Sequence, residues 1–388
     1  MNFFMFLAVI FISLIIYCYI AYPVALWFSA NIFGNSKSEA SPKNRLMPEV
    51  TLLIPGHNIR HLINRKIKNI MNLQYEGNLT FLFVLDGCND GSKELLESYH
   101  DKETPYPIKI YASSIRVGKE AAIANALKNV CSEVLVFSDA DAILDLNCVD
   151  ALVETLMKHG IGAVSGREIH QKISNNGAGE GQGLFYKYEE FIKTHLTKIG
   201  SLPYVQGGNF AMLRKLYPEK IPTGCTQDGI IAFDVVLKGY RVAYEPNAVS
   251  REEYSLSSKE DFLRRVRTVN RALYSILCRP KIFNPIKTGW YFIHVFSGRV
   301  LRWFTLFFGF FAVISLLASG SPVAVLLTMT GAAIWIIFLL LGLFAEEKGI
   351  RIKLPYFVFY FTYIHVAAAI AVLKVMLGIK TTTWKPSR

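Results

Sequence analysis

The sequence predicts an α/β domain, with a mostly parallel sheet covered by helices on both faces, held between transmembrane helices at both ends of the chain. Two observations carry this prediction. Apolar runs long enough to cross a membrane are concentrated at the two ends of the 388 residues. Between them, strand-like and helix-like patterns alternate, as expected of parallel strands connected by helices.

Residues 1–30 are expected to anchor the chain in a membrane. No charged residue occurs between Phe3 and Ala30, and at about 1.5 Å per residue a helix of this length crosses about 30 Å of hydrocarbon. A cleavable signal peptide is the alternative interpretation. However, no basic residue precedes Phe3, and the run is longer than the apolar part of such a peptide.

Residues 300–378 are expected to contain about three further transmembrane helices, at Trp303 to Leu317, Val323 to Phe344 and Pro355 to Leu377. The residues before them, 256–299, are expected to form amphipathic or interfacial helices at the membrane surface.

Positive charges beside these runs predict an integral protein of the cell membrane whose central domain, residues 46–255, is cytoplasmic. Lys37, Lys43 and Arg45 follow the first run, and the link between the last two runs is also basic, whereas the link at 318–322 is uncharged and expected outside. The six cysteines have no paired or metal-binding spacing, which agrees with a reducing compartment.

The formal net charge of +12 indicates anionic partners. No Lys/Arg tract alternates with aromatic residues as in a nucleic-acid-binding surface, so no nucleic-acid partner is expected. Membrane lipids and phosphorylated substrates account for the charge more simply.

Apolar runs within the central domain predict its strands. They are Val50 to Ile54, Phe81 to Leu85, Ile108 to Tyr111, Val134 to Phe137, Gly162 to Val164 and Arg241 to Tyr244. Helical patterns such as Lys119 to Val130 and Leu146 to Lys158 separate them, and the glycine-rich stretch Ser174 to Gly183 is expected to be a loop.

Polar residues follow the first two strands, at the sheet edge where α/β proteins bind ligands. Pro55 and Gly56 force a turn that places Asn58 at the mouth of the sheet. Asp86 ends the second strand, where its carboxylate could accept hydrogen bonds from a base or ribose. Each position could also belong to an ordinary turn between a strand and a helix.

Lys119 is expected at the start of a helix, directly after Gly118, which lets another molecule approach the backbone closely. A lysine in a first helical turn can reach the base or the phosphates of a nucleotide, although a solvated lysine is an equally good interpretation of this position alone. The segment lacks the other glycines and the Ser/Thr of a P-loop.

An acidic triplet, Asp139-Ala140-Asp141, follows the apolar run Val134 to Phe137. Two carboxylates at this edge can hold a divalent cation against a diphosphate, and hard oxygen ligands without a Cys/His cluster favour Mg²⁺ or Mn²⁺ over zinc. Helix capping is the alternative, but it would explain only one of the two aspartates.

Two later segments contribute further candidate residues. Gly207-Gly208-Asn209 offers a backbone that another molecule can approach closely, or it forms a simple turn. Thr226 is a good N-cap, which places Gln227 and Asp228 in the first turn of the next helix. Asp228 could complement the helix dipole or act as a general base that deprotonates an acceptor hydroxyl.

An amphipathic basic helix is expected just before the C-terminal membrane region. Its apolar face carries residues such as Phe262 and Val266, whereas Arg264, Arg267 and Arg271 lie on the opposite face. The arginines could contact lipid headgroups or neutralise a departing diphosphate with bidentate hydrogen bonds, and the two roles are compatible.

In their order and spacing, these motifs resemble those of the membrane-bound family 2 glycosyltransferases, the group that contains chitin, hyaluronan, cellulose and poly-N-acetylglucosamine synthases. The resemblance covers about residues 48–275. It implies an A-type nucleotide-sugar-binding fold and transfer with inversion. It also implies roles for individual residues: donor binding by Pro55, Asn58, Asp86, Lys119, Asp139, Arg264 and Arg267, metal binding by Asp139 and Asp141, general-base catalysis by Asp228, and acceptor binding by Gly207, Gly208, Asn209 and Gln227.

The sequence departs from the processive synthases at three places. Their Gln-x-x-Arg-Trp motif reads Arg264-Arg265-Val266-Arg267-Thr268, their Glu before the base is Gln227, and the Glu after the first-strand Asn is Ile59. The base Asp228 and the central arginine are kept, which implies catalysis without implying processive synthesis of a polymer.

The expected reaction is therefore an inverting transfer from a nucleotide diphosphate sugar, with a UDP-sugar as the expected donor, to a hydroxyl of a saccharide or lipid-linked saccharide. It would serve polysaccharide or glycolipid synthesis with Mg²⁺ or Mn²⁺ as cofactor, and membrane lipids would be further partners. Two alternatives stay open. One is transfer to polyprenyl phosphate, which needs no base, and the other is a membrane subunit that binds nucleotide sugar without turnover.

Overall fold

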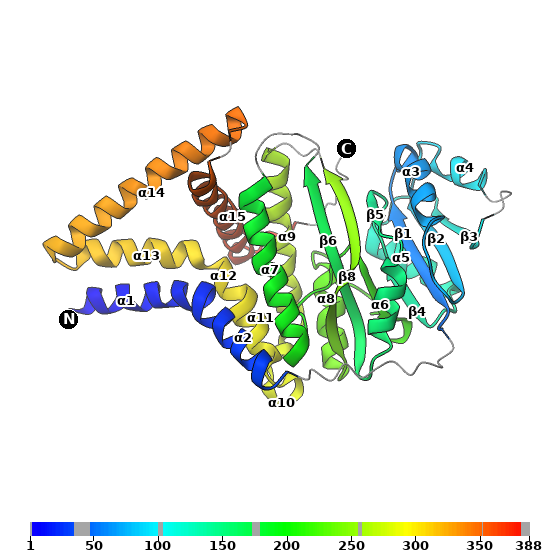
Figure 1. The fold of residues 1–388 in the computed structure, drawn as a ribbon, viewed down its shortest axis with the longest axis horizontal. Coiled ribbons are helices and arrows are strands. Elements are labelled where there is room, and N and C mark those ends of the chain that lie inside the picture. The colour runs from blue at the N-terminus through cyan, green and yellow to red at the C-terminus, as the bar shows by residue number, and fades with distance from the viewer. Residues whose placement is uncertain are drawn as a thin grey trace.

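The computed structural model describes residues 2–34, 47–99, 104–172, 179–254, 258–350 and 352–381. A mixed eight-stranded sheet with its covering helices forms one end of the molecule, and long apolar helices project from the other end (Figure 1). The predicted α/β domain with membrane helices at both ends of the chain is confirmed.

The sheet has the strand order β3-β2-β1-β4-β7-β6-β8-β5. The strands β1 to β4 pair in parallel, β7 is antiparallel to both of its neighbours, β6 and β8 are parallel, and β5 is antiparallel to β8. Their bounds are β1 Val50–Gly56, β2 Leu79–Asp86, β3 Ile108–Ser113, β4 Val134–Phe137, β5 Ala142–Leu144, β6 Ile161–Lys172, β7 Phe210–Leu213 and β8 Arg241–Tyr254.

The sheet is less parallel than predicted, because the two short antiparallel strands β5 and β7 were not among the predicted strands. The predictions also ended β6 at Val164 and β8 at Tyr244, whereas these strands pair with each other as far as Lys172 and Tyr254. The extended part of this pair matters for the site, because it carries Glu168 and Glu252.

Helices cover both faces of the sheet, so its central strands are buried on both sides. Alternate residues of β1 enter different cores, Leu53 on one face and Leu52 on the other, as the period of two along a strand requires. Side chains of α5 and α8 pack on the first face, and those of α3 and α6 pack on the second. The helices are α3 Arg60–Ile70, α4 Ser92–Glu97, α5 Lys119–Ala126, α6 Cys148–Leu156, α7 Gly179–Ile199, α8 Gln227–Leu237 and α9 Ser258–Cys278.

The prediction of a loop at Ser174 to Gly183 is partly wrong. The helix α7 begins at Gly179, so the last residues of that stretch are helical, while 173–178 lie outside the described residues. Glycines usually weaken a helix, but packing of the later part of α7 overrides this local preference. Residues of that part, Ile192 and Leu196, are buried in the core beside α5 and α8.

Among the described residues, three helical segments are long and apolar enough to cross a membrane: Phe3–Ile32, Pro322–Lys348 and Lys353–Met376. A fourth span results only if Tyr291–Trp303 and Thr305–Ala318, which meet at 60°, are taken together. The span expected at Trp303 to Leu317 is therefore too short by itself. The helices of these regions are α1 Phe3–Ile16, α2 Tyr22–Ile32, α10 Pro285–Thr288, α11 Tyr291–Val295, α12 Leu301–Trp303, α13 Thr305–Ala318, α14 Pro322–Lys348 and α15 Lys353–Met376.

The basic helix α9 packs against the last of these spans, and α15 and α9 lie between the sheet and the projecting helices (Figure 1). Val266 of α9 shares a buried cluster with Ala367 and Ala371 of α15. The apolar face of α9, expected at a membrane surface, therefore packs against protein.

Candidate functional site

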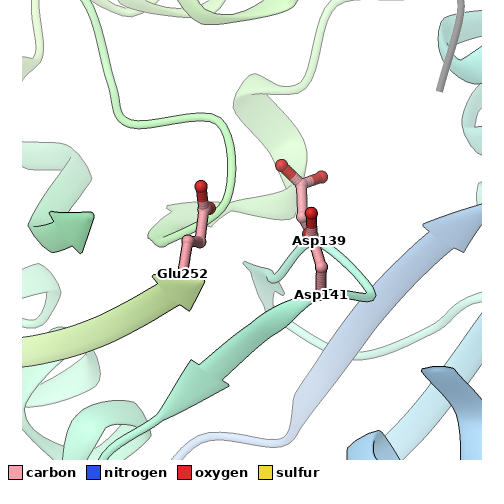
Figure 2. A group of neighbouring side chains, drawn as sticks. All are labelled: Asp139, Asp141 and Glu252. Atoms are coloured by element: carbon pink, nitrogen blue, oxygen red, sulfur yellow. The ribbon is translucent and has the colours of Figure 1, made fainter. Parts of the chain in front are cut away.

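Three carboxylates converge at the carboxyl edge of the sheet. Asp139, Asp141 and Glu252 each bring one oxygen to within 4.8 Å of the others, and Figure 2 shows their side chains pointing to the same side. Asp139 and Asp141 lie in the turn between β4 and β5, and Glu252 lies on β8 opposite Ala142. The two predicted metal ligands are thus joined by a third carboxylate, which sequence reasoning missed because β8 was expected to end at Tyr244.

This acidic cluster, defined as Asp139, Asp141 and Glu252, fits a hard divalent cation. Oxygen ligands lie about 2.1 Å from Mg²⁺, so opposite ligands are about 4.2 Å apart, close to the limit of 4.8 Å in this cluster. Burial, Asp139 and Glu252 raise the pKa of Asp141 to about 6. A cation would relieve this mutual repulsion of the carboxylates.

A buried lysine lies beneath the acidic cluster. Lys66 of α3 is 1% exposed, and its Nζ donates hydrogen bonds to Ser138 Oγ, Asp139 O and Ala142 O. Burial lowers the pKa of Lys66 to about 8, although Asp141 and Asp139 act in the opposite direction. Lys66 was not among the predicted site residues, but its place on the apolar face of α3 was a usable signal.

Lys119 contacts the acidic cluster from the start of α5. Its Nζ lies 2.5 Å from Asp139 Oδ1, and Gly118 before it has a φ of 97°, in the region that favours glycine. Burial lowers the pKa of Lys119, but the negative charges of Asp139 and Asp228 outweigh that effect and raise it. The predicted donor-binding lysine therefore contacts the acidic cluster and is close enough to Asp228 to interact with its charge.

Asp86 holds the loop that leads to Lys119. It is 4% exposed, and its two carboxylate oxygens accept hydrogen bonds from the backbone N–H groups of Val117 at 2.7 Å and Gly118 at 2.9 Å. Its position at the end of β2 is the expected one. Its hydrogen bonds show that it also fixes the entry of α5.

Pro55 and Asn58 lie where the first strand ends. The turn expected at Pro55 and Gly56 is wrong, because both residues continue β1 and the bend follows them. Pro55 is buried in that strand opposite Val84. Asn58 has a φ of 54°, and its side chain exchanges two hydrogen bonds with Asn89 from the loop after β2. Asn58 therefore joins the ends of the first two strands.

The adjacent glycines at 207 and 208 lie beside Asp228 and the acidic cluster, respectively. A Cβ added at Gly207 would lie 2.9 Å from Asp228 Oδ1, and one added at Gly208 would lie 2.8 Å from Glu252 Oε1. Gly208 N donates to Glu168 Oε1 at 3.0 Å, so Glu168, which was not among the predicted site residues, holds this loop. Another molecule was expected to approach the backbone of this loop closely. In the structure, carboxylates of the chain itself make that approach.

The two amides predicted at the acceptor side differ in their surroundings. Asn209 is fully buried, and its Nδ2 donates to the carbonyls of Arg167 and Ala248. Its side chain therefore joins strands beneath the loop. Gln227 is 7% exposed, and its Nε2 has no hydrogen-bond partner among the described residues.

Asp228 lies in the first turn of α8. The N-cap expected at Thr226 is confirmed, because its hydroxyl accepts from Gly229 N at 3.1 Å. Burial raises the pKa of Asp228 to about 6, with Lys119 opposing this effect and Asp139 adding to it. A carboxylate whose pKa approaches the working pH suits a general base.

The arginines of α9 differ in their partners. Arg271 donates to Glu120 Oε1 at 2.5 Å and to the carbonyl of Cys225, which ties α9 to the start of α5. Arg264 pairs with Asp261 at 3.1 Å. Arg267 makes no ion pair with any described residue, and burial together with Arg271 and Arg264 lowers its pKa. A half-buried cation in such positive surroundings suits an anionic ligand.

Residues 51–219 match the model of the family described as Glycosyl transferase family 2. The matched stretch contains the acidic triplet and the loop at 206–209. It ends before Asp228 and Glu252.

Two of the curated relatives that match part of the chain differ in their named activity. The poly-beta-1,6-N-acetyl-D-glucosamine synthase of Staphylococcus aureus (strain COL) is 26% identical over 211 residues, which is 52% of this chain and 48% of the relative. The O-antigen chain rhamnosyltransferase RfbN of Salmonella typhimurium is 28% identical over 145 residues, which is 35% of this chain and 46% of the relative. The chain spans about half the length of the curated relatives it matches.

A solved structure shares the fold over nearly the whole chain. The mannosyltransferase PcManGT from Pyrobaculum calidifontis, in complex with GDP-Man and Mn²⁺, superposes with a TM-score of 0.69 at 19% identity, over 96% of this chain and 99% of that chain. This likeness includes the membrane helices as well as the sheet. Residues 51–219 therefore match glycosyl transferase family 2, and the chain has the A-type fold that the resemblance implied.

Proposed function

We propose that this protein transfers a sugar, with inversion, from a nucleotide diphosphate sugar to a hydroxyl of a saccharide or lipid-linked saccharide. One observation carries the proposal: Asp228 lies beside Gly207, and the acidic cluster lies beside the adjacent Gly208. A base and a cation site this close can act on the two ends of one displacement, in which the acceptor oxygen attacks as the diphosphate departs.

In this proposal Asp228 accepts the proton of the attacking hydroxyl. The raised pKa of about 6 still leaves Asp228 ionised at neutral pH, and Lys119 and Arg271 lower its pKa against burial. Arg267, with Arg264 one turn before it, would hold the oxygens of the leaving diphosphate. Mg²⁺ or Mn²⁺, held by Asp139, Asp141 and Glu252, would supply further neutralisation of that charge when bound.

For the donor, we propose a nucleotide sugar whose base and ribose lie beside Asn58, Asp86 and Lys119. The curated relative from Staphylococcus aureus is named a poly-beta-1,6-N-acetyl-D-glucosamine synthase, and the structural neighbour was solved with GDP-Man. Both UDP- and GDP-sugars therefore belong in the test, with UDP-sugars as the expected class.

The proposal places residues 46–255 on the cytoplasmic side, as a domain of an integral protein of the cell membrane. The link between α14 and α15 carries Lys348 and Lys353 at its ends, and the positive-inside rule assigns such a link to the cytoplasm. Nucleotide sugars are cytoplasmic metabolites in this scheme, so the donor site and the donor would share one compartment.

The test is release of nucleotide diphosphate by the purified protein in detergent, with lipid extract and Mn²⁺, from a panel of UDP- and GDP-sugars. Release from one donor should disappear in Asp228→Asn, while binding of that donor should stay near the wild-type level, because the amide keeps the shape but cannot take a proton. An active Asp228→Asn protein would contradict the base and favour a phosphate acceptor, which is already an anion. Donor binding without release from any donor would favour a non-catalytic binding subunit.

A further inference from the structure

The ammonium group of Lys66 donates three hydrogen bonds to the turn beneath the acidic cluster. Nζ donates to Ser138 Oγ at 2.7 Å, to Asp139 O at 3.0 Å and to Ala142 O at 2.6 Å. Burying an ammonium costs several kcal/mol unless its protons find acceptors. These three bonds therefore explain how a lysine that is 1% exposed can occupy the core-facing side of α3.

A second residue of α3 holds the next part of the same turn. Asn69 Nδ2 donates to Leu144 O at 2.7 Å, and Leu144 N donates to Asn69 Oδ1 at 3.0 Å. Lys66 and Asn69 are three positions apart and thus lie on one side of the helix. The helix α3 therefore holds 138–144 from one side, while β8, which carries Glu252, pairs with β5 on the other.

We propose that Lys66 is a positioning residue for the cation site: it fixes the backbone of Asp139 and Ala142 so that the carboxylates of Asp139 and Asp141 converge with Glu252. The inference rests on the proposed function, because it requires that the acidic cluster bind a divalent cation. Lys66 itself offers no ligand atom, so its effect must pass through the turn that it holds.

The charge of Lys66 acts in the opposite direction to its hydrogen bonds. An ammonium repels a divalent cation, so removing the charge alone would tighten cation binding. Removing the three hydrogen bonds would let the turn relax, and loss of a group that orients metal ligands typically weakens affinity about 10–100-fold. The sign of the change in Mn²⁺ affinity therefore separates a positioning role from a charge-balancing role.

The experiment compares Mn²⁺ binding by the full chain in detergent, without nucleotide sugar, from the electron paramagnetic resonance signal of free Mn²⁺. Lys66→Met should raise the apparent Kd about 10–100-fold. Ser138→Ala, which removes one acceptor and keeps the lysine, should raise it by less. The matched control is Lys128→Met, because Lys128 is an exposed lysine beyond the end of α5, and it should bind Mn²⁺ like the wild type.

Turnover provides a second readout, because saturating Mn²⁺ would not restore turnover that was lost through general structural damage. Because Lys66→Met keeps all three carboxylates, saturating Mn²⁺ should return its nucleotide release toward the wild-type rate. Unchanged or tighter Mn²⁺ binding by folded Lys66→Met would overturn the proposal. If that variant shows no cooperative unfolding transition, wild-type Mn²⁺ affinity in both Ser138→Ala and Asn69→Ala would overturn it instead.

Failure of this inference is distinguishable from failure of the proposed function. Mn²⁺ binding by the wild type with no change in the variants would overturn the role of Lys66 alone. A wild-type protein that binds no Mn²⁺ would overturn the cation site of the proposed function and, with it, the role of Lys66.

Discussion

At the residue scale, the site depends on two positions where a side chain is absent. The loop at 206–209 approaches Asp228 through Gly207 and the acidic cluster through Gly208. A Cβ added at Gly207 would lie 2.9 Å from Asp228 Oδ1, and a Cβ added at Gly208 would lie 2.8 Å from Glu252 Oε1. The two glycines are therefore not equivalent, because Gly207 gives clearance to Asp228 and Gly208 gives clearance to carboxylates on the side of the cluster.

Replacing each of these glycines with alanine should affect the base and the cation site independently. Gly207→Ala should lower kcat about 100-fold, since small misplacements of a reacting group cost that much, while Mn²⁺ affinity stays near wild type. Gly208→Ala should instead weaken Mn²⁺ binding about 10-fold or more. Gly309→Ala is the matched control, because a Cβ at Gly309 meets nothing within 4 Å. Equal effects of both site variants on both quantities would contradict this division.

The raised pKa of Asp228 predicts how activity depends on pH. With a value of about 6 in the donor-free protein, kcat/KM should fall as the pH drops through 6, because the protonated carboxyl cannot act as a base. A kcat/KM that stays constant between pH 7 and pH 5 would contradict this assignment of the base.

The same shift predicts a dependence of stability on pH. The folded state binds a proton at Asp228 that the unfolded chain releases near pH 4, so this group favours folding at low pH and less so as the pH rises through 6. In metal-free protein, Asp228→Asn should therefore raise Tm relative to wild type more at pH 7.5 than at pH 5. Thermal unfolding of both proteins at the two pH values measures this difference, and an equal difference at both would refute it.

Which site residues could be predicted depended on how they come together. Asp139 and Asp141 are separated by one residue in the sequence, so local spacing alone predicted that they act as a pair. Glu252 and Lys66 reach the same place through strand pairing and helix packing, which the local pattern does not encode. Asn209 shows the converse, since it was expected in a segment that another molecule can approach, and its side chain is fully buried.

At the element scale, α9 is fastened to α5 by one arginine. Arg271 lies 2.5 Å from Glu120 Oε1 and also donates to the carbonyl of Cys225, three residues before Asp228. Since Glu120 follows Lys119 directly, this contact links α9 to the proposed base Asp228 and to the proposed donor-binding Lys119. Arg267, one turn earlier, has no ion pair with any residue that the structure describes.

Methionine at these two arginines should give contrasting results. Arg271→Met leaves Glu120 and a carbonyl without their partner, so the free energy of unfolding should fall by about 1–3 kcal/mol. Arg267→Met removes no such contact and should keep wild-type stability, yet weaken binding of nucleoside diphosphate. Thermal unfolding and calorimetric titration with UDP and Mn²⁺ measure the two effects. Loss of stability in Arg267→Met with unchanged UDP binding would argue against its proposed role.

Long elements of the sheet were easier to predict than short ones. The runs that became β1, β2 and β4 are buried on both faces and read as continuous apolar stretches. The strand β5 has only three residues, Ala142–Leu144, too few for a period to show. It forms because β8 and Asn69 supply hydrogen bonds to it, and these partners are distant in the sequence.

At the scale of the whole molecule, the last membrane span is fastened to the sheet-bearing domain. Half of the most apolar stretch of α15 is buried, whereas none of that of α14 is. Asn270 of α9 extends this attachment past the end of α15, because its side chain bonds to Ile379 O and Thr381 N. The sequence predicted both elements but not their contact, since an apolar helix face fits a lipid surface and a protein partner equally well.

The proposed orientation can be tested with a native thiol. Cys131 is exposed on the domain that we place in the cytoplasm. In a variant that retains only this cysteine, a membrane-impermeant maleimide should label permeabilised cells and not intact ones. Ala318→Cys in a cysteine-free background, at the link expected outside, should label in intact cells. Labelling of Cys131 in intact cells would reverse the proposed topology.

The pairing of Ala142 with Glu252 limits where residues can be inserted during evolution. A one-residue insertion inside β8 before Glu252 would shift the register and turn that side chain to the opposite face of the sheet. The same insertion in the loop between β7 and α8 would leave the pairing intact. Natural length variation in descendants of this sequence should therefore gather in such loops and spare 249–252, even though glutamate there belongs to no contiguous motif.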